Sequence, residues 1–552
     1  MKLFTRGLTL LGLLASIPST RADSRTNPPI ADGLRFELRL PEGKTRFQQG
    51  ETIPIRLLFS NRSPQTLCLD TFHNSPPLNM AVFASFEVSP GEGATNPLGD
   101  LPTETGYRNG LFNGPPPPVP QVLSEKPIEV PLVLNEYIRF DRPGTFQICA
   151  TTNYVFAVAP GQPIPTQGSF FGRGPSVSSI PLPIEIVPAN PTWQQEQIKL
   201  WRDFWAKQKQ SSVSYEWYTP IGVHPPTNDL RFLNTQSSAQ TIIEHQRQDI
   251  YPPRSSTEAD FWRSGLIGFS DRLWLIGAMK TAIKEPDYPV TQGFLDNLAT
   301  LQALYHQTQT GPTPVTDLIW KAKAKATLAN WQLTFNYLTS KKGVARAITV
   351  HSLLELACHS EAAKAPQVRQ KLPHLVTMVP DVFNDLPELP QHCLLVDQYD
   401  SMYGVGEWNL IKSPRLVAPL VREWQKVPHA EEREMWMQMR TGDLILRHLY
   451  ELSPKTTRPL ILKEMAAPQP RASFKVLSLL EDKYLLQLQN IWWAHLNSNG
   501  ANQDTAALLI GRYADSSLKA RVEREYARRK RDKTISYEVG VGLSRYLARV
   551  DS

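Results

Sequence analysis

The sequence predicts a multidomain protein, in which an antiparallel β-sandwich is followed by an all-α solenoid built from helical hairpins. Three observations predict this fold class. At 552 residues the chain is too long for a single hydrophobic core. Apolar and polar residues alternate in short segments up to about residue 187. From about residue 195 onward, apolar residues recur at helical spacing instead.

The composition is that of an ordinary folded protein. Hydrophobic residues make up 41% and charged residues 20% of the chain, which excludes global disorder. The 48 prolines are concentrated in the N-terminal half, where they suit edge strands and loops but would break helix interiors. The formal net charge of +7 is small for this length, and much of the excess comes from residues 519–533.

Residues 1–22 are predicted to be a signal peptide. Two basic residues precede an apolar run from about Leu8 to Ile17, and small residues follow it. This layout is typical of secretory signals, and the run is too short to be a stable membrane span. Cleavage near Ala22 would give an exported protein, periplasmic or secreted. No later stretch reaches the length of a transmembrane segment, so none is expected in the mature chain.

The segment 33–188 is predicted to form the β-sandwich. In "LRFELRL" (34–40), four apolar residues alternate with charged ones. Turns rich in Pro, Gly, Asn and Ser separate this segment from further alternating segments at 50–61, 130–140, 144–158 and 179–187. Because no helices are expected between them, the strands should be antiparallel. Prolines in "IPLPIEI" (180–186) favour an edge strand there.

The segment 195–552 is predicted to be all-α. The period changes between residues 188 and 195, where tryptophans begin to recur at helical spacing. Short breaks separate the predicted helices, which lie at 271–284, 291–307, 319–338, 345–360, 414–427, 442–452, 458–465, 472–483, 484–496, 505–513, 518–530 and 538–552. The last of them ends without the polar capping element that solenoids need, which points to a truncated chain or to closure on a partner.

The predicted helices carry weak internal repetition. "VAPLVREW" (417–424) and "RPLILKEM" (458–465) begin 41 residues apart and end in the same basic, acidic and large apolar order. We interpret them as inner helices of neighbouring hairpins, with the pairs Arg422–Glu423 and Lys463–Glu464 facing outward or towards the next unit. Repetition every 30 to 45 residues is typical of an α-solenoid, and units of variable length favour the HEAT-like class. An irregular helical bundle with chance similarity is the alternative.

The chain as a whole resembles a known group of proteins. The segments that carry the resemblance are "FQQGETIPIRLLFSNRS" (47–63), "FDRPGTF" (140–146) and "PANPTWQ" (188–194). They resemble an uncharacterised family of exported bacterial proteins that join an Ig-like sandwich to HEAT-like helical repeats. These are packing and turn motifs, so the resemblance implies a fold and an exported location but no activity, cofactor or catalytic residue.

Four cysteines could form two disulfides in an oxidising compartment. Cys68 and Cys149 each alternate with inward residues, so both should point to the outer face of their sheets. A Cys68–Cys149 disulfide could form if their strands are neighbours, although bridges between sheets need inward cysteines. The second candidate is a Cys358–Cys393 disulfide across neighbouring hairpins.

Cys358 and His359, with His392 and Cys393, are the usual ligand types of a tetrahedral zinc site. Adjacent residues on a helix point about 100° apart, so each pair would struggle to present both ligands to one metal. We therefore interpret Cys358 as a core residue on the apolar face of its helix.

Searches for catalytic motifs find nothing. The sequence contains no G-x-S-x-G, no H-E-x-x-H and no G-x-x-x-x-G-K, so we name no catalytic residue and no cofactor, and an enzyme is the less favoured hypothesis.

The strongest electrostatic feature is the basic run within 519–533. Its candidate anion-binding residues are Arg521, Arg524, Arg528, Arg529, Lys530 and Arg531. Nucleic acid is not expected as a partner outside the cytoplasm, whereas anionic envelope polymers or lipid head groups fit the charge. Glutamates interleave with the basic residues, so a solvated helix face is the simpler interpretation.

These observations predict an exported, non-catalytic binding or scaffold protein of the cell envelope, with a helical-repeat surface for a protein or peptide partner. Two alternatives stay open. One is a hydrolase of envelope polymers with a carboxylate site between the domains. The other is a protease inhibitor that acts through sandwich loops such as 113–121.

Overall fold

A computed structural model gives the structure of the protein. It describes residues 33–70, 84–97, 120–162, 164, 174–208, 229–247, 266–310, 316–359, 361–386, 412–427, 435–467, 470–472, 474–497 and 503–552. The predicted signal peptide (1–22), residues 113–119 of the proposed inhibitor loop (113–121), His392 and Cys393 lie outside these residues.

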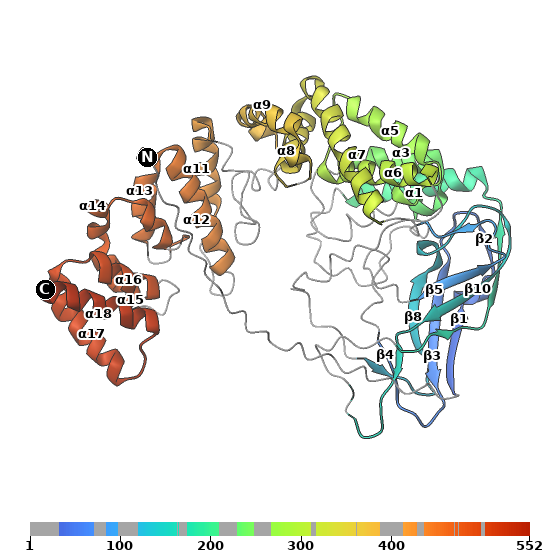
Figure 1. The fold of residues 1–552 in the computed structure, drawn as a ribbon, viewed down its shortest axis with the longest axis horizontal. Coiled ribbons are helices and arrows are strands. Elements are labelled where there is room, and N and C mark those ends of the chain that lie inside the picture. Colours follow the sequence, from blue (N-terminus) through green and yellow to red (C-terminus); the bar gives the residue numbers. More distant parts are fainter. Residues whose placement is uncertain are drawn as a thin grey trace, which may run out of the picture. The chain divides into compact units, whose positions relative to one another are not determined.

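The described chain contains an N-terminal β region (34–187) followed by a helical region (Figure 1). It divides into two compact units, the first holding the strands with residues 229–232, and the second holding the helical residues from 196 on.

The strands of the first unit pair into four sheets within the described residues. One sheet has the order β1-β3-β8, from β1 (Leu34–Arg39), β3 (Pro54–Asn61) and β8 (Ile128–Val133). The second has the order β12-β10-β13-β2, from β12 (Val177–Ser178), β10 (Gly144–Thr152), β13 (Leu182–Val187) and β2 (Arg46–Gln48), with β5 (Ser85–Ser89) also on β10. The two smaller sheets are β11-β4-β7, from β11 (Val155–Ala157), β4 (Leu67–Leu69) and β7 (Gln121–Val122), and β6-β9, from β6 (Ala94–Thr95) and β9 (Arg139–Phe140).

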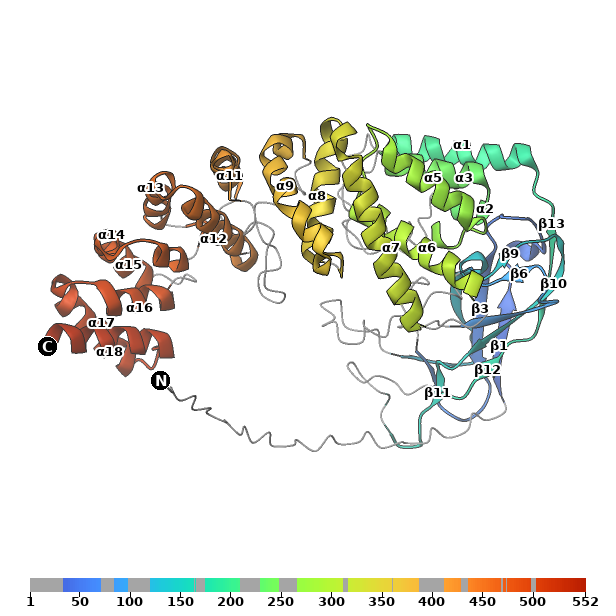
Figure 2. The ribbon, with the colours of Figure 1, turned by 45° about the horizontal axis from the view of Figure 1, so that its top comes forward.

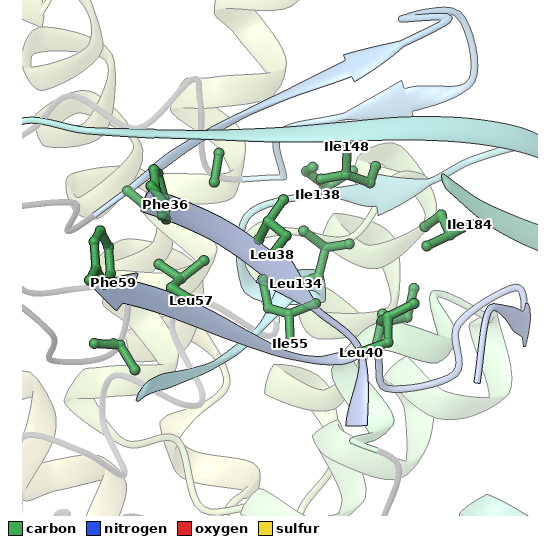
Figure 3. Packing of buried hydrophobic residues seen from close by; sticks show 14 of the residues in the cluster. Phe36, Leu38, Leu40, Ile55, Leu57, Phe59, Leu134, Ile138, Ile148 and Ile184 are labelled. Atoms are coloured by element: carbon green, nitrogen blue, oxygen red, sulfur yellow. The ribbon is translucent and has the colours of Figure 1, made fainter. Parts of the chain in front are cut away.

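One hydrophobic core is shared by strands of the two larger sheets (Figure 3). Phe36 on β1 stacks on Phe59 on β3 with ring centroids 4.5 Å apart. On β10, Phe146, Ile148 and Ala150 are buried while Gln147 and Cys149 between them are more exposed, which is the period of two expected of a strand with one buried face. The alternation found in the sequence is thus the signal that places this core.

The prediction of an edge strand at 180–186 is wrong, because β13 lies between β10 and β2. The pairing with β2 involves only Glu185–Val187 and runs parallel, unlike the antiparallel pairing expected throughout. Pro183 therefore lies outside the β2 ladder, and its missing N–H interrupts no hydrogen bond on that side.

Residues 229–232 are fastened to the first unit by charged contacts. The Asp229 backbone N–H donates to Thr52 Oγ1 at 3.2 Å. The Arg231 guanidinium, largely buried, pairs with the carboxylates of Asp229 and Glu136. Burial alone would lower the pKa of Arg231, but these two carboxylates raise it above its ordinary value.

Helices make up most of the described chain from residue 191 on (Figure 2). They are α1 (Pro191–Gln208), α2 (Leu230–Leu233), α3 (Gln236–Gln246), α5 (Arg272–Lys284), α6 (Gln292–Thr310), α7 (Thr316–Asn336), α8 (Gly343–His359), α9 (Pro366–Val382), α11 (Val417–Lys426), α12 (Met435–Leu452), α13 (Pro454–Met465), α14 (Asp482–Leu485), α15 (Gln489–Leu496), α16 (Gln503–Tyr513), α17 (Lys519–Arg531) and α18 (Tyr537–Asp551). The helix predicted at 472–483 is instead a 3₁₀ segment, Phe474–Leu479, followed by α14.

Most of these helices pack chiefly against helices one or two places away along the chain. α6 contacts α7, α7 contacts α8 and α8 contacts α9, and α12 contacts both α11 and α13. Figure 2 shows α7, α8 and α9 side by side in chain order. None of the helices in the described residues is long and apolar enough to cross a membrane.

The two echoing segments lie on α11 and α13, and both helices pack against α12. Trp424 and Met465 are buried, as expected of packing residues. Of the two predicted orientations, outward or towards the next unit, the outward one is wrong for the acidic residues, because Glu423 and Glu464 are also buried. Glu464 is paired with the Arg471 guanidinium at 2.9 Å, which compensates its charge inside the protein.

Candidate functional site

The α5–α6 connector, which we define as residues 285–291, runs along α8 and is fastened to it by polar contacts. The Lys342 backbone N–H donates to the Pro286 carbonyl at 3.0 Å. Further along α8, the Thr349 hydroxyl accepts from the Val290 backbone N–H at 3.2 Å. The connector, which would otherwise be an exposed loop, is thereby held in one conformation.

Lys341, just before α8, makes two further hydrogen bonds to this connector. Its Nζ donates to the carbonyl oxygens of Glu285 at 2.6 Å and Tyr288 at 2.7 Å. Burial lowers the pKa of Lys341 to about 8, although the carboxylates of Glu285 and Asp287 oppose this shift. Only 3% of Lys341 is exposed, so its role is to hold the connector against the start of α8 and it is shielded from any substrate in solution.

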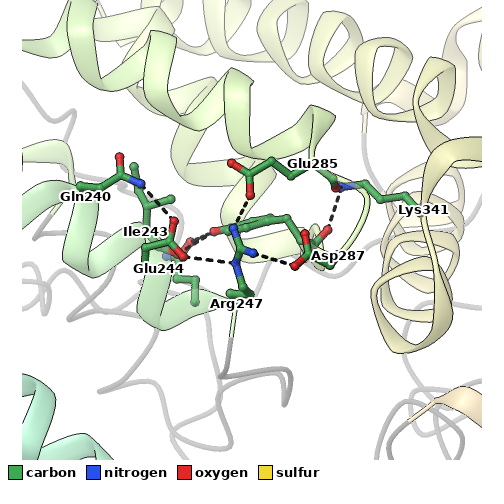
Figure 4. A network of polar contacts seen from close by, with 9 residues as sticks. Gln240, Ile243, Glu244, Arg247, Glu285, Asp287 and Lys341 are labelled. Carbon is green, nitrogen blue, oxygen red and sulfur yellow. Dashed lines mark hydrogen bonds and ion pairs between the residues drawn. The ribbon is translucent and has the colours of Figure 1, made fainter.

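Arg247, the residue that ends α3, joins that helix to the same connector (Figure 4). Its guanidinium lies 2.8 Å from Asp287 and also pairs with Glu285, while Glu244 on α3 lies 3.2 Å from Nε. Burial alone would lower the pKa of Arg247, but the three carboxylates raise it.

The buried Tyr288 side chain completes the cluster, because its hydroxyl donates to the Ile243 carbonyl of α3 at 2.9 Å. Burial raises the pKa of Tyr288 well above its ordinary value, so the hydroxyl stays protonated and keeps this bond. The whole cluster therefore ties α3, the connector and α8 together, and its geometry is that of a structural joint.

A second polar group on α8 has properties that acid–base sites share. His351 Nδ1 lies 3.9 Å from Glu355 Oε2, and His351 Nε2 is buried and has no hydrogen-bond partner among the described residues. The Gln292 amide nitrogen, in the orientation that satisfies both amide atoms, lies 2.8 and 2.9 Å from the two carboxylate oxygens of Glu355. Burial lowers the pKa of His351 to about 4 and raises the pKa of Glu355 to about 7. Near neutral pH the His351 imidazole is therefore uncharged, and Glu355 is the member of the pair whose pKa lies in the range that acid–base groups use.

The His351–Glu355 pair predicts opposite pH dependences for two single variants. Glu355 has a raised pKa in the folded state, so its contribution to stability is complete below pH 4.5 and is lost as the pH rises through about 7. His351 has a lowered pKa, so its contribution is complete above pH 6.5 and is lost as the pH falls through about 4. In the native protein these two dependences oppose each other between about pH 4.5 and 6.5.

We therefore expect Glu355→Gln to lose stability on acidification relative to the native protein, and His351→Asn to lose stability as the pH rises from 4.5 to 7. Urea unfolding midpoints of the full chain, measured from pH 4 to 8, test this. Other titrating groups affect all three proteins alike, so differences between the profiles isolate the pair. Parallel profiles would contradict the assignment of these pKa shifts.

The basic run lies on α17, and the structure separates its members. Arg529 is buried, donates to Glu525 and, through Nη2, to the Leu496 carbonyl at 2.6 Å. The prediction of Arg529 as an anion-binding residue is therefore wrong, because its side chain is buried and cannot meet an anion from solution. Arg521, Arg524, Arg528, Lys530 and Arg531 are exposed.

Cys68 on β4 and Cys149 on β10 are free thiols on strands of different sheets, so the Cys68–Cys149 disulfide is absent from the structure. The prediction that Cys68 points to the outer face of its sheet implies an exposed thiol, and this is wrong. Cys68 is fully buried, on a strand that pairs on both sides. Cys149 is partly exposed, and its Sγ donates to the Ser179 carbonyl at 3.2 Å.

We expect iodoacetamide to modify Cys149 in the native protein and Cys68 only after unfolding. Burial raises the pKa of the Cys68 thiol and also blocks access to it, so less reactive thiolate is available. Mass spectrometry of the labelled, unreduced protein gives the order of modification. Equal rates would contradict this placement, and resistance of both residues would indicate a disulfide.

The suggested zinc ligands are only partly described. Cys358 is partly exposed near the end of α8, and His359 is the last residue of that helix. His392 and Cys393 lie outside the described residues, so the zinc site and the Cys358–Cys393 disulfide stay predictions. Among the described residues, no three His, Cys, Asp or Glu side chains are grouped so that they could hold a metal ion.

Comparisons with known proteins do not assign the chain to a family. No protein-family model matches the chain, and neither a curated protein nor a solved structure matches it.

Proposed function

We propose that the protein is an exported, non-catalytic binding or scaffold protein of the cell envelope, and that its helical region is the surface offered to a protein or peptide partner. The observation that carries this proposal is the order of helix packing. Helices of the second unit contact chiefly their neighbours along the chain, as α6, α7, α8 and α9 do. A chain packed in this way leaves successive helices with uncovered faces, which together make an extended surface for a long partner.

The same observation supports a HEAT-like α-solenoid for the helical region. α11 and α13 carry the repeated sequence segments, and both pack on α12, as inner helices of neighbouring hairpins would. For the β region we propose an Ig-like sandwich, supported by the single core that strands of the two larger sheets share. The resemblance to exported bacterial proteins that join these two folds agrees with both proposals.

The proposal of a binding role is also supported by what the polar clusters do. Lys341 donates hydrogen bonds to backbone carbonyls of the connector, and Arg247 pairs with its carboxylates. These contacts restrict the motion of this part of the second unit. A stiff array loses little conformational entropy when it binds, so rigid joints of this kind suit a scaffold. Export rests on the basic and apolar pattern of residues 1–22.

The test is capture of partners from the cell envelope with the mature chain, followed by titration of the purified partner. We expect saturable binding to at least one envelope protein. A matched pair of variants locates the surface. Leu273→Glu changes an exposed apolar residue of α5, and Ile180→Glu changes one of the β region. Loss of binding in the first variant alone would support the helical surface, while loss in the second alone would contradict it. Hydrolysis of an envelope polymer by the purified protein would overturn the non-catalytic proposal.

A further inference from the structure

Four arginines form one straight line along the exposed face of α17. We call Arg521, Arg524, Arg528 and Arg531 the arginine stripe. Their spacings of three, four and three residues place them on a single face of a helix with 3.6 residues per turn, over about 15 Å. The neighbouring face of the helix is buried through Val522, Glu525 and Arg529.

The stability of α17 accounts for only part of the stripe, namely Arg528, which pairs with Glu525 and Asp532 three and four residues away. Cations are favourable near the C-terminus of a helix, where Arg528 and Arg531 lie, but unfavourable near its N-terminus. Arg521 lies in the first turn, which contains no acidic residue. Like charges three or four residues apart also repel each other, and the stripe contains three such neighbouring pairs. A helix selected only for its own stability would carry acidic residues at some of these positions.

Most of the stripe is held in place by its surroundings. The Arg521 guanidinium lies over the Trp493 ring of α15, 4.9 Å from the ring centroid. Arg528 donates to both carboxylate oxygens of Glu525, at 2.9 and 2.6 Å, and Arg531 Nε lies 3.2 Å from Asp532 Oδ1. Side chains ordered in advance lose less freedom when a ligand binds.

The stripe also concentrates the charge of the protein. Residues 519–533 contain eight basic and three acidic side chains, a net charge of five, while the whole chain of 552 residues has a net charge of +7. Half of the Arg528 side chain and most of the Arg531 side chain are exposed. Within the described residues, Arg524 is exposed and has no ionic or hydrogen-bond partner.

We propose that the arginine stripe binds an acidic α-helical segment of the partner protein. This inference rests on the proposed function and specifies the chemistry of the partner. Neighbouring arginines of the stripe are about 4.5 to 6 Å apart along the axis, which matches carboxylates three or four residues apart on a second helix. Side chains on one face of an extended peptide recur at about 6.6 Å or more, which is wider. The planar guanidinium also binds a carboxylate through two parallel hydrogen bonds, which lysine cannot do.

The test uses the full mature chain and a fluorescent helical peptide of about 20 residues, a length at which isolated helices form. Its glutamates are spaced alternately three and four residues apart, and a control peptide has the same composition in scrambled order. We expect the designed peptide to bind in a fluorescence anisotropy titration and the scrambled peptide to bind much more weakly. Equal binding of the two peptides would overturn the proposed register.

Matched double variants test the residues. Arg524→Gln with Arg531→Gln removes two charges from the stripe, and Lys321→Gln with Lys325→Gln removes two exposed charges from α7. We expect roughly tenfold weaker peptide binding in the first variant and less than about a twofold change in the second. Circular dichroism shows whether the variants stay folded. Equal effects of the two variants would overturn the proposal in favour of non-specific attraction.

Two further outcomes separate this proposal from its alternatives. If Arg524→Lys with Arg531→Lys binds as well as the native chain, the guanidinium fork has no role and the proposal fails. Tighter binding to phosphatidylglycerol vesicles than to the peptide would show that a membrane surface is the occupant instead. If the Arg524→Gln, Arg531→Gln variant captures an envelope partner as well as the native chain does, the proposal that the stripe binds the partner fails and the proposed function stands. Peptide binding without any captured partner would overturn the proposed function alone.

Discussion

Replacing Gly542 with alanine is expected to destabilise the C-terminal helices by about 3 kcal/mol, near the upper end of the usual cost of overpacking. Gly542 on α18 faces α16 so closely that a Cβ would lie 2.3 Å from the Ala507 carbonyl oxygen and 2.8 Å from the Leu508 nitrogen. Both contacts are with backbone atoms, which no side-chain rotation can move away. The two helices would have to separate and lose part of their buried contact.

Gly277→Ala is the matched control, because nothing lies within 4 Å of a Cβ built at this position on α5. The same substitution there should stabilise the helix by about 0.5–1 kcal/mol, since alanine has the higher helix propensity. Amide hydrogen exchange measured by mass spectrometry resolves the two regions separately. Unchanged protection of 503–513 and 537–551 in the Gly542→Ala variant would contradict the close approach of α16 and α18.

Replacing Glu464 with alanine is expected to cost about 3 kcal/mol, because it leaves the Arg471 charge without its partner. Glu464 accepts hydrogen bonds from Arg471 through the backbone N–H at 2.5 Å and through Nη2 at 2.9 Å. The Arg471 guanidinium also lies over the Trp424 ring, 4.5 Å from the centroid, so both ends of this contact are largely covered. The pair therefore connects α11, α13 and the segment that follows.

The exposed pair Arg142–Glu92, at 2.7 Å, provides the comparison. Water screens this pair, so Glu92→Gln should change the free energy of unfolding by less than about 0.5 kcal/mol. Urea denaturation measures both effects, with protection of the amides in 454–465 as the local readout for Glu464→Ala and of those in 144–152 for Glu92→Gln. A small effect of Glu464→Ala, comparable with that of Glu92→Gln, would show that Glu464 is not the buried counter-ion described here.

The division into a β region and a helical region could be predicted because each has its own period of apolar residues. α9 was not predicted, and its prolines explain why: Pro373 and Pro380 lie inside the helix, where proline is normally read as a break. The buried residues Val368, Leu375 and Val379 recur at helical spacing and could have indicated it. In this helix the apolar period was the better signal.

The clusters of charge were beyond sequence reasoning, because their members are far apart in the chain. Arg247 and Asp287 are 40 residues apart, and their contact depends on how α3 packs against the connector. Nothing local distinguishes Asp287 from an acidic residue in an ordinary turn. The burial of Arg529, in contrast, could have been found, since it shares one helical face with Val522 and Glu525.

The central claim, that the helical region is the binding surface, is tested most directly by hydrogen exchange of the mature chain with and without its captured partner. The account predicts that the partner increases protection within the helices from α3 onward, with the largest increase on any element that it covers. Increased protection confined to residues 33–188 would contradict the claim and assign binding to the β region.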